Sequence, residues 1–147
     1  PSAPTGAITA WLTSSFRSSA TMSVAATARK SSTYWALKQI CIAGLVQALS
    51  EGLAFGMRAG LDCEKVIEEI SKGAAQSWQM ENRGGTMVED KFEFGFAVDW
   101  MRKDLRICRE EAKGNGTPLP VTETVARFYD EVSAMGGGRR STVRPGA

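Results

Sequence analysis

The chain has 147 residues, of which 43% are hydrophobic and 8% aromatic, and it carries a formal net charge of +2. This composition excludes a disordered chain, and the length suits one domain with a substantial core rather than a two-domain enzyme. The small net charge indicates no particular class of partner.

The first segment, residues 1–33, is rich in Ser, Thr and Ala and contains no acidic residue. One short helix is predicted in it, because four apolar residues have helical spacing, at Ile8, Trp11, Leu12 and Phe16. Thr5 is a candidate N-cap for this helix. We divide the chain into this segment, a helical domain over residues 34–138, and a basic tail over residues 139–147.

A long amphipathic helix is predicted from about residue 38 to 59. Apolar residues recur at three- and four-residue spacing over about six turns, at Leu37, Ile40, Cys41, Leu45, Ala48, Leu49, Leu53, Phe55 and Met57. Gly60 follows as the glycine expected just past a helix end. Gly44, Gly52 and Gly56 are spaced so that another helix can approach closely, and we expect this face to be packed.

Shorter helices are predicted next. Asp62 is the expected N-cap of a helix that turns Val66, Ile67 and Ile70 inward and ends at Gly73. A helix around residues 76–82 follows, with a turn at Gly84–Gly85. Aromatic residues then alternate at Phe92, Phe94 and Phe96, which is typical of a strand, but the segment is too isolated to build a sheet.

Two further helices complete the domain. The first, about residues 97–113, has an apolar face and ends at Gly114; the face consists of Val98, Met101, Leu105, Cys108 and Ala112. The prolines in residues 117–120 then break the chain. The last helix, about residues 121–135, stops at three glycines and turns four residues inward: Val121, Val125, Phe128 and Val132. We therefore predict an all-α single domain with a long central helix.

Histidine is absent from the sequence, which excludes Ser-His-Asp and Cys-His catalytic arrangements and histidine-based zinc sites. The three cysteines, Cys41, Cys63 and Cys108, lie too far apart for a metal motif. We predict no metal site and interpret the cysteines as buried thiols in a reducing compartment, the cytoplasm.

The ends of the chain are basic, since the first acidic residue is Glu51 and the last nine residues have three arginines and no acid. Such ends can contact nucleic acid, but sparse charges without interleaved aromatic residues favour solvated tails, so we expect no nucleic-acid partner. No secretory signal pattern opens the sequence. The most apolar stretch, about residues 40–59, is interrupted by Gln47, Glu51 and Arg58, so we also expect no membrane span.

Two segments carry a family resemblance. Residues 95–105, GFAVDWMRKDL, and residues 73–82, GAAQSWQMEN, closely resemble the C-terminal helical domain of the β-hydroxyacid dehydrogenases, the 3-hydroxyisobutyrate dehydrogenase family. The resemblance covers about residues 38–138 and implies the fold of the 6-phosphogluconate dehydrogenase C-terminal domain. In that family the helical domain closes one wall of the active site, and a separate N-terminal Rossmann domain carries NAD or NADP. This sequence lacks the Gly-x-Gly-x-x-Gly fingerprint, so no cofactor is expected for the chain alone.

The resemblance also implies roles for single residues. Lys103 matches the lysine that reaches the nicotinamide-ribose end of the cofactor, while Phe96 and Asp104 match residues that border the substrate pocket. Without the resemblance, Lys103 and Asp104 would be an ordinary charged pair on a solvated helix. Trp78 and Asn82 share a helix face one turn apart, and the sequence fits equally a pocket wall or a core tryptophan with a nearby cap.

The family's acid/base position departs from the pattern. The family has a lysine in a Lys-x-x-Asn motif at the start of the long helix, and here the lysine position holds Trp35 and the asparagine position holds Lys38. An indole cannot exchange a proton with a hydroxyl at neutral pH, which makes Lys38 the candidate substitute. The change of pattern at both ends suggests a gene fragment with shifted or recruited flanks.

Two classes of function stay open. The first is an oligomeric scaffold or small-ligand-binding module, without catalysis of its own, whose ligand would be a small hydroxy acid. The alternative is a subunit of an NAD(P)-dependent 3-hydroxyacid oxidoreductase that uses a Rossmann domain from another chain. Because the long helix is amphipathic, we expect a homodimer in either case.

Overall fold

The computed structural model describes residues 24–92 and 96–139, and for residues 24–30 it describes only the backbone. The described residues form five α-helices followed by a π-helical turn, and they contain no β-strand. The all-α prediction is therefore confirmed. The predicted helix around Ile8 to Phe16, and all of the basic tail except Arg139, lie outside the described residues.

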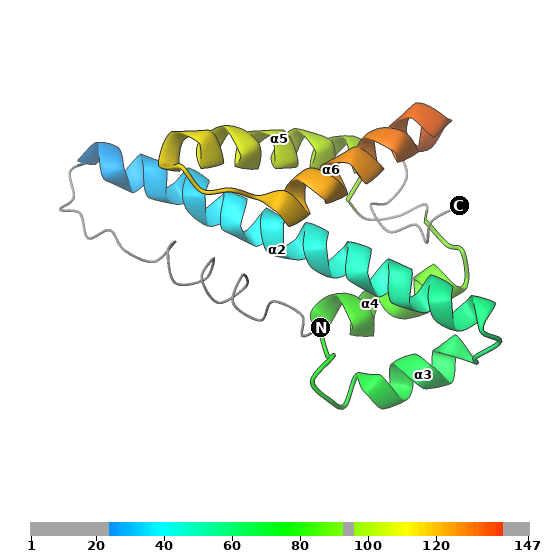
Figure 1. The fold of residues 1–147 in the computed structure, drawn as a ribbon. Helices are drawn as coiled ribbons and strands as arrows, with labels where there is room; N and C mark the ends of the chain where they lie inside the picture. The colour runs from blue at the N-terminus through cyan, green and yellow to red at the C-terminus, as the bar shows by residue number, and fades with distance from the viewer. Residues whose placement is uncertain (1–23, 93–95, 140–147) are drawn as a thin grey trace, which may run out of the picture.

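One long helix organises the others (Figure 1). Helix α2 runs through the middle of the domain, with α5 and α6 along one side and α3 and α4 along the other. The bounds are Val24–Arg58 for α2, Cys63–Ile70 for α3, Trp78–Val88 for α4, Val98–Asn115 for α5 and Pro120–Val132 for α6. The π-helical turn Ser133–Gly137 follows α6 directly.

The central helix is longer than predicted, with 35 residues that begin at Val24. It ends where predicted, because Gly60 has a φ of +78°, a conformation that glycine adopts without steric cost. By length and composition, residues 31–58 could cross a membrane. A core helix passes the same test, and α2 packs against α3, α4, α5 and α6.

The predicted inner stripe of α2 is largely wrong. Leu37 and Phe55 are 60% and 76% exposed, and Leu45 is exposed as well. Leu53 is buried as predicted, but the other buried residues lie on the opposite side of the helix and include small and polar ones: Ala36, Gln39, Ala43, Val46 and Ser50. Because apolar residues occupy both sides of α2, periodicity alone could not identify the side that faces the core.

Two apolar clusters form the core, and α2 contributes to both. The first joins α2 to α5 and α6 and contains Ala43, Val98, Met101, Leu105, Val125, Ala126 and Tyr129. The second joins α2 to the α3 and α4 side and contains Val46, Leu53, Cys63, Met87 and Phe92. Since burial of one large apolar side chain contributes roughly 1.5–3 kcal/mol, this double packing fixes α2 between the other helices.

Asp62 caps α3 as predicted, because its side chain accepts a hydrogen bond from the Lys65 backbone N–H at 3.3 Å. The turn predicted at Gly84–Gly85 is wrong, since both glycines lie inside α4. A Cβ on Gly84 would lie 2.9 Å from Cδ1 of Ile67. This glycine therefore allows α3 and α4 to pack closely rather than turning the chain.

The end of α5 differs from the prediction, whereas the stop after α6 agrees with it. Helix α5 continues past Gly114 and ends at Gly116, which has a φ of +74°. Pro120 occupies the first turn of α6, where its missing N–H costs no hydrogen bond. Gly136, at a φ of +82°, interrupts the helical conformation after α6, as the predicted glycine stop requires.

Helix α6 buries only part of the predicted face. Val125 is buried and Val132 packs against the first core cluster as predicted, but Val121 is 65% exposed and Phe128 is also exposed. Thr122 and Tyr129 are buried in their place. The predicted stripe ignored polar residues, and the helix turns a threonine and a tyrosine inward instead.

The three cysteines do not share one environment. Cys63 and Cys108 are buried as predicted, and the prediction for Cys41 is wrong, because it is exposed on α2. The Cys63 thiol lies 3.7 Å from the Leu53 carbonyl oxygen, to which it donates. Cys41 lies on the same outward side of α2 as Leu37 and Leu45.

Candidate functional site

A cavity of about 260 Å³ opens between α2, α4 and the start of α5. It contains three of the residues singled out from the sequence: Lys38, Trp78 and Phe96. The other lining residues are Trp35, Gln39, Ile42, Val46, Gln79, Arg83 and Met101. The structure thus brings together residues that are far apart in the sequence.

Helical spacing directs these side chains into the cavity. Trp35, Lys38 and Ile42 follow one another at three- and four-residue steps along one side of α2. Gln79 and Arg83 are one turn apart on α4. Ser77 fixes the start of α4, since its Oγ accepts the Met80 N–H at 3.1 Å.

Two cations lie against tryptophan rings in this cavity. The Nζ of Lys38 is 3.7 Å from the centroid of the Trp35 ring, and the guanidinium carbon of Arg83 is 5.8 Å from the centroid of the Trp78 ring. Such cation–π contacts contribute about 0.5–1 kcal/mol at exposed sites. Lys38 and Arg83 are the two charged residues among the described residues that line this cavity.

A buried hydrogen bond lies behind the cavity wall. The Gln39 Nε2 donates to Oδ2 of Asp104, and both side chains are buried. Asp104 does not itself line the cavity, and the role at the substrate pocket that the family resemblance implies for it stays a prediction. This contact holds the amide of Gln39 in one orientation.

Cys108 lies one turn beyond Asp104 on α5 and is also buried. Burial, with the charge of Asp104 as the second cause, raises the pKa of the Cys108 thiol to about 11. Its Sγ donates to the Ala36 carbonyl oxygen at 3.5 Å. A thiol that stays protonated at neutral pH is a poor nucleophile, so Cys108 is a packing residue.

Aromatic residues form one edge of the cavity. Phe96 packs edge-to-face on Trp100, with ring centroids 5.6 Å apart and an interplanar angle of 77°. Trp100 itself is exposed. The start of α5 therefore presents apolar surface beside the cavity.

Asn82 and Lys103 lie outside the cavity. The Asn82 side chain is exposed, and its Nδ2 donates to the Trp78 carbonyl oxygen at 2.9 Å. Lys103 is exposed on α5 and does not line the cavity. The roles that the sequence analysis gave to these two residues stay predictions.

Arg83 and Gln39 are not among the site residues predicted from the sequence. Arg83 was overlooked because the predicted helix ended at Asn82, which placed Arg83 in a turn rather than one helical turn from Gln79. Gln39 has no motif of its own, and only the tertiary contact with Asp104 reveals its position.

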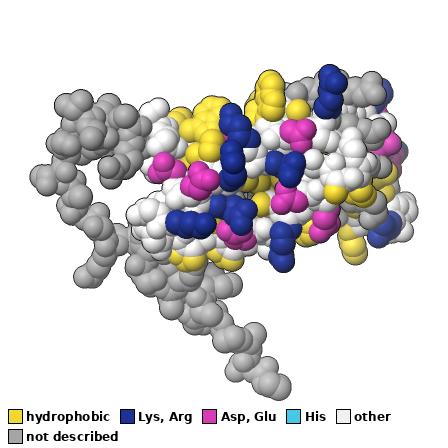
Figure 2. All heavy atoms as spheres, turned by 90° about the horizontal axis from the view of Figure 1, so that it is seen from above, with side chains coloured by type: hydrophobic (Ala, Val, Ile, Leu, Met, Phe, Trp, Pro, Cys, Tyr) yellow, Lys and Arg dark blue, Asp and Glu magenta, His cyan; other side chains and the backbone are white. Residues whose placement is uncertain are grey.

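A different face of the molecule carries ion pairs. Figure 2 shows Lys and Arg side chains interspersed with Asp and Glu over the face that it presents. On α5 and α6, Arg102 Nε donates to Asp130 at 2.7 Å and Arg109 Nε to Glu123 at 2.8 Å. Mixed charges of this kind provide no uniform basic surface on this face for a polyanion.

The family model described as NAD-binding of NADP-dependent 3-hydroxyisobutyrate dehydrogenase matches residues 30–144. This chain belongs to that family. An uncharacterized oxidoreductase of Shewanella frigidimarina is 62% identical to it over 106 residues, which are 72% of this chain and 36% of the relative. The 2-hydroxy-3-oxopropionate reductase of Escherichia coli is 33% identical over 101 residues, 69% of this chain and 35% of the relative.

Solved structures agree with this assignment. The 3-hydroxyisobutyrate dehydrogenase of Salmonella typhimurium superposes with a TM-score of 0.69 at 29% identity, over 75% of this chain and 39% of that chain. The enzyme of Mycobacterium tuberculosis, at 17% identity and a TM-score of 0.66, shares the fold over 73% of this chain and 39% of its own. The chain spans about a third of the length of the curated relatives that it matches.

Because the chain belongs to this family, the residue at the family's acid/base position, residue 35, bears directly on function. In the register of the sequence analysis, the lysine of the 3-hydroxyisobutyrate dehydrogenase motif corresponds to Trp35. The structure places Trp35 on the cavity wall, with the Lys38 ammonium on its ring. Lys38 is therefore beside the cavity, but one turn further along α2 than the motif's lysine.

Proposed function

We propose that this helical domain binds a small hydroxy acid through its carboxylate in the cavity between α2, α4 and α5, without hydride transfer of its own. The observation that carries the proposal is that Lys38 and Arg83 line one cavity, where the other described lining residues are aromatic, apolar or amide. Ammonium and guanidinium groups are the natural donors to a carboxylate. A cavity of about 260 Å³ suits a small acid.

The absence of independent turnover follows from position 35. Hydride transfer from a hydroxy acid requires a base that accepts the hydroxyl proton. The Trp35 indole has no atom that can accept this proton, because its N–H is a donor only. Loss of an acid/base residue lowers the rate by about 10²–10⁴-fold. NAD or NADP, which the family uses, would supply the hydride acceptor when bound, and Lys103 is the residue proposed to contact it.

An NMR titration of the 147-residue chain with sodium 3-hydroxyisobutyrate tests this proposal. Perturbed resonances should cluster on Lys38, Arg83 and neighbouring lining residues. The variant Arg83→Leu should weaken binding about tenfold or more, because a charged hydrogen bond contributes roughly 1.5–3 kcal/mol. Arg106→Leu is the matched control, since Arg106 is exposed on α5 and does not line the cavity. Equal weakening in both variants would contradict the assignment.

A second candidate is an oxidoreductase subunit completed by a Rossmann domain from another chain. The exposed Trp100 beside the cavity favours it, because a neighbouring domain could cover this aromatic surface. Mixing the chain with the isolated N-terminal domain of a full-length relative, NAD and the hydroxy acid tests it. Reduced nicotinamide that forms with the natural chain, and not with Lys38→Ala, would favour this candidate. We propose the cytoplasm as the location in either case.

A further inference from the structure

Three aromatic side chains line the cavity between α2, α4 and α5, and they come from three parts of the chain. Trp35 is on α2, Trp78 begins α4, and Phe96 precedes α5. The two tryptophans are 41% and 58% exposed. Exposed aromatic surface that converges on one cavity is typical of a binding site for an aromatic or apolar group.

The other apolar residues of the cavity wall belong to the core. Val46 and Met101 are buried core residues, and Ile42 packs against both core clusters. The Phe96 ring is oriented by its edge-to-face contact with Trp100. An apolar part of a ligand therefore meets a preformed surface, which reduces the cost of ordering side chains on binding.

The size of the cavity favours a ligand larger than 3-hydroxyisobutyrate. Its volume of about 260 Å³ lies just below the range of about 300–1,000 Å³ that is usual for cavities of drug-sized ligands. The substituent of 3-hydroxyisobutyrate is a methyl group, which leaves part of the apolar wall in contact with water. A phenyl ring in its place covers more of the wall, and the favourable free energy grows with the apolar area removed from water.

Position 35 departs from the family in the direction that such a ring requires. In the register of the sequence analysis, a tryptophan stands where the 3-hydroxyisobutyrate dehydrogenase motif has a lysine. The difference removes an ammonium group from the cavity wall and adds an indole, which packs favourably against other aromatic rings. The wall keeps positive charges at Lys38 and Arg83, whose side chains suit a carboxylate.

We propose that this cavity selects hydroxy acids that carry an aromatic ring. The ring packs among Trp35, Trp78 and Phe96, while the carboxylate pairs with Lys38 and Arg83. This selectivity rests on the proposed function, because the same two cations bind the carboxylate there. It adds the chemical class of the substituent, which the proposed function leaves undefined.

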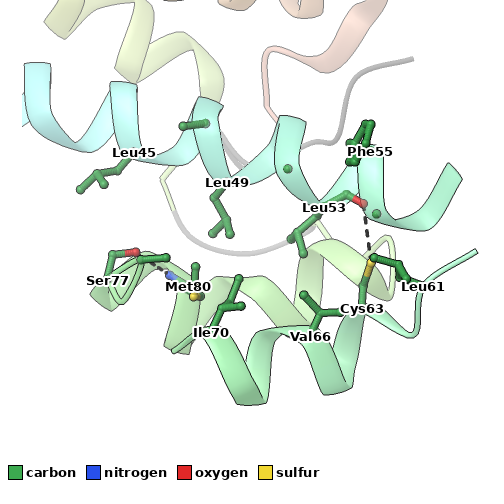
Figure 3. A pocket seen from close by; sticks show the side chains of 14 residues that line it. Leu45, Leu49, Leu53, Phe55, Leu61, Cys63, Val66, Ile70, Ser77 and Met80 are labelled. Carbon is green, nitrogen blue, oxygen red and sulfur yellow. Dashed lines mark hydrogen bonds between the residues drawn. The ribbon is translucent and has the colours of Figure 1, made fainter. Parts of the chain in front are cut away.

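A second cavity provides a contrast. It has a volume of about 330 Å³, opens between α2, α3 and α4, and is lined mainly by apolar side chains of the described residues. Figure 3 shows Leu49 and Leu53 pointing from α2 toward α3 in this cavity. A neutral aromatic molecule fits such surroundings, but a carboxylate that loses its hydration there is costly. An aromatic acid therefore favours the cavity in which Lys38 and Arg83 supply donors.

Two acids that differ in one substituent test the selectivity. In 3-hydroxy-2-phenylpropanoate a phenyl ring replaces the methyl group of 3-hydroxyisobutyrate, and the carboxylate and hydroxyl groups are the same. In NMR titrations of the 147-residue chain, the phenyl acid should have a dissociation constant about tenfold or more lower, because its ring buries more apolar surface and packs on aromatic rings. Perturbed resonances should cluster on Trp35, Trp78 and Phe96, and not on Leu49 and Ile70 of the second cavity.

Variants of the two tryptophans locate the ring. Trp35→Leu and Trp78→Leu should each reduce the preference for the phenyl acid severalfold, and Trp35→Phe, which keeps a ring, should retain most of it. Both tryptophans are exposed, so these variants leave the core intact. Tyr34→Leu is the matched control, because Tyr34 is an exposed aromatic residue next to Trp35 that does not line the cavity. It should leave the preference unchanged.

The outcomes distinguish this selectivity from the proposed function. Equal binding of the two acids, with both perturbing the cavity, would overturn the selectivity and leave the proposed function standing. A preference that Trp35→Leu and Trp78→Leu do not change would also overturn it. Failure of either acid to perturb Lys38 and Arg83 would contradict both proposals.

A neutral analogue tests the part played by the charge. The alcohol 2-phenylethanol has the ring and the hydroxyl group of the phenyl acid without its carboxylate. It should bind about tenfold or more weakly than the phenyl acid, because it makes no charged hydrogen bond to Lys38 or Arg83. Equal binding of the alcohol and the phenyl acid would overturn the proposal, since the cavity would then recognise the ring alone.

Discussion

The side chain of Gln39 on α2 donates a hydrogen bond to the buried carboxylate of Asp104 on α5. This contact joins the cavity wall to the first core cluster. We predict that Gln39→Ala lowers the free energy of unfolding by about 1.5–3 kcal/mol, because a buried charge loses a donor. Urea unfolding of the full chain measures this effect.

Gln47→Ala is the matched control for that variant. Gln47 is on the same helix and donates to Glu51 at 3.0 Å in an exposed contact. Its removal should cost less than about 0.5 kcal/mol, as is usual for exposed polar pairs on a helix. Similar decreases in the free energy of unfolding of the two variants would show that the buried hydrogen bond stabilises the fold no more than the exposed one.

Two neighbouring glycines of α4 should respond differently to alanine. Gly85→Ala should stabilise the protein by about 0.5–1 kcal/mol, because the added Cβ meets open space and alanine favours a helix. Gly84→Ala should gain less or lose stability, because its Cβ would press on Ile67 at 2.9 Å. Denaturation midpoints of the two variants provide the comparison, and equal gains would contradict the close packing of α3 and α4.

Stability should fall at alkaline pH partly through Cys108. Burial raises the pKa of this thiol from 9.0 to about 11 in the folded chain, so the folded state prefers the protonated form. The contribution of the protonated thiol to the free energy of unfolding is fully present below pH 9 and is lost as the pH rises through 11. Unfolding measured between these values should show a shallower loss in Cys108→Ala than in the natural chain. Parallel curves would exclude a role for this thiol.

Much of the fold could be predicted from the sequence because its signals are local. Gly60 and Asp62 act through backbone conformation and a hydrogen bond between near neighbours, and both are found in the predicted roles. Gly84 shows the limit of such reasoning. The sequence cannot distinguish a glycine that turns the chain from one that admits a neighbouring helix, because the difference is Ile67 of α3.

The candidate site was less accessible to sequence reasoning. The resemblance singled out Lys38, Trp78 and Phe96, which the structure places around one cavity. Arg83 enters the same cavity from α4, which continues beyond the predicted end at Asn82 and through two glycines that sequence patterns treat as a break. The exposed side of α2 posed the same difficulty, since Leu37 and Ala43 are both apolar and only packing decides which is buried.

Binding of a hydroxy acid without its oxidation is the behaviour that most directly tests the function proposed for this domain. The purified chain should be supplied with NAD or NADP and with 3-hydroxyisobutyrate at a concentration that saturates the NMR titration. We predict bound acid, no reduced nicotinamide in the absorbance record, and no change in that record for Lys38→Ala. Turnover that disappears in Lys38→Ala would contradict this result and would make Lys38 the acid/base residue of an active enzyme.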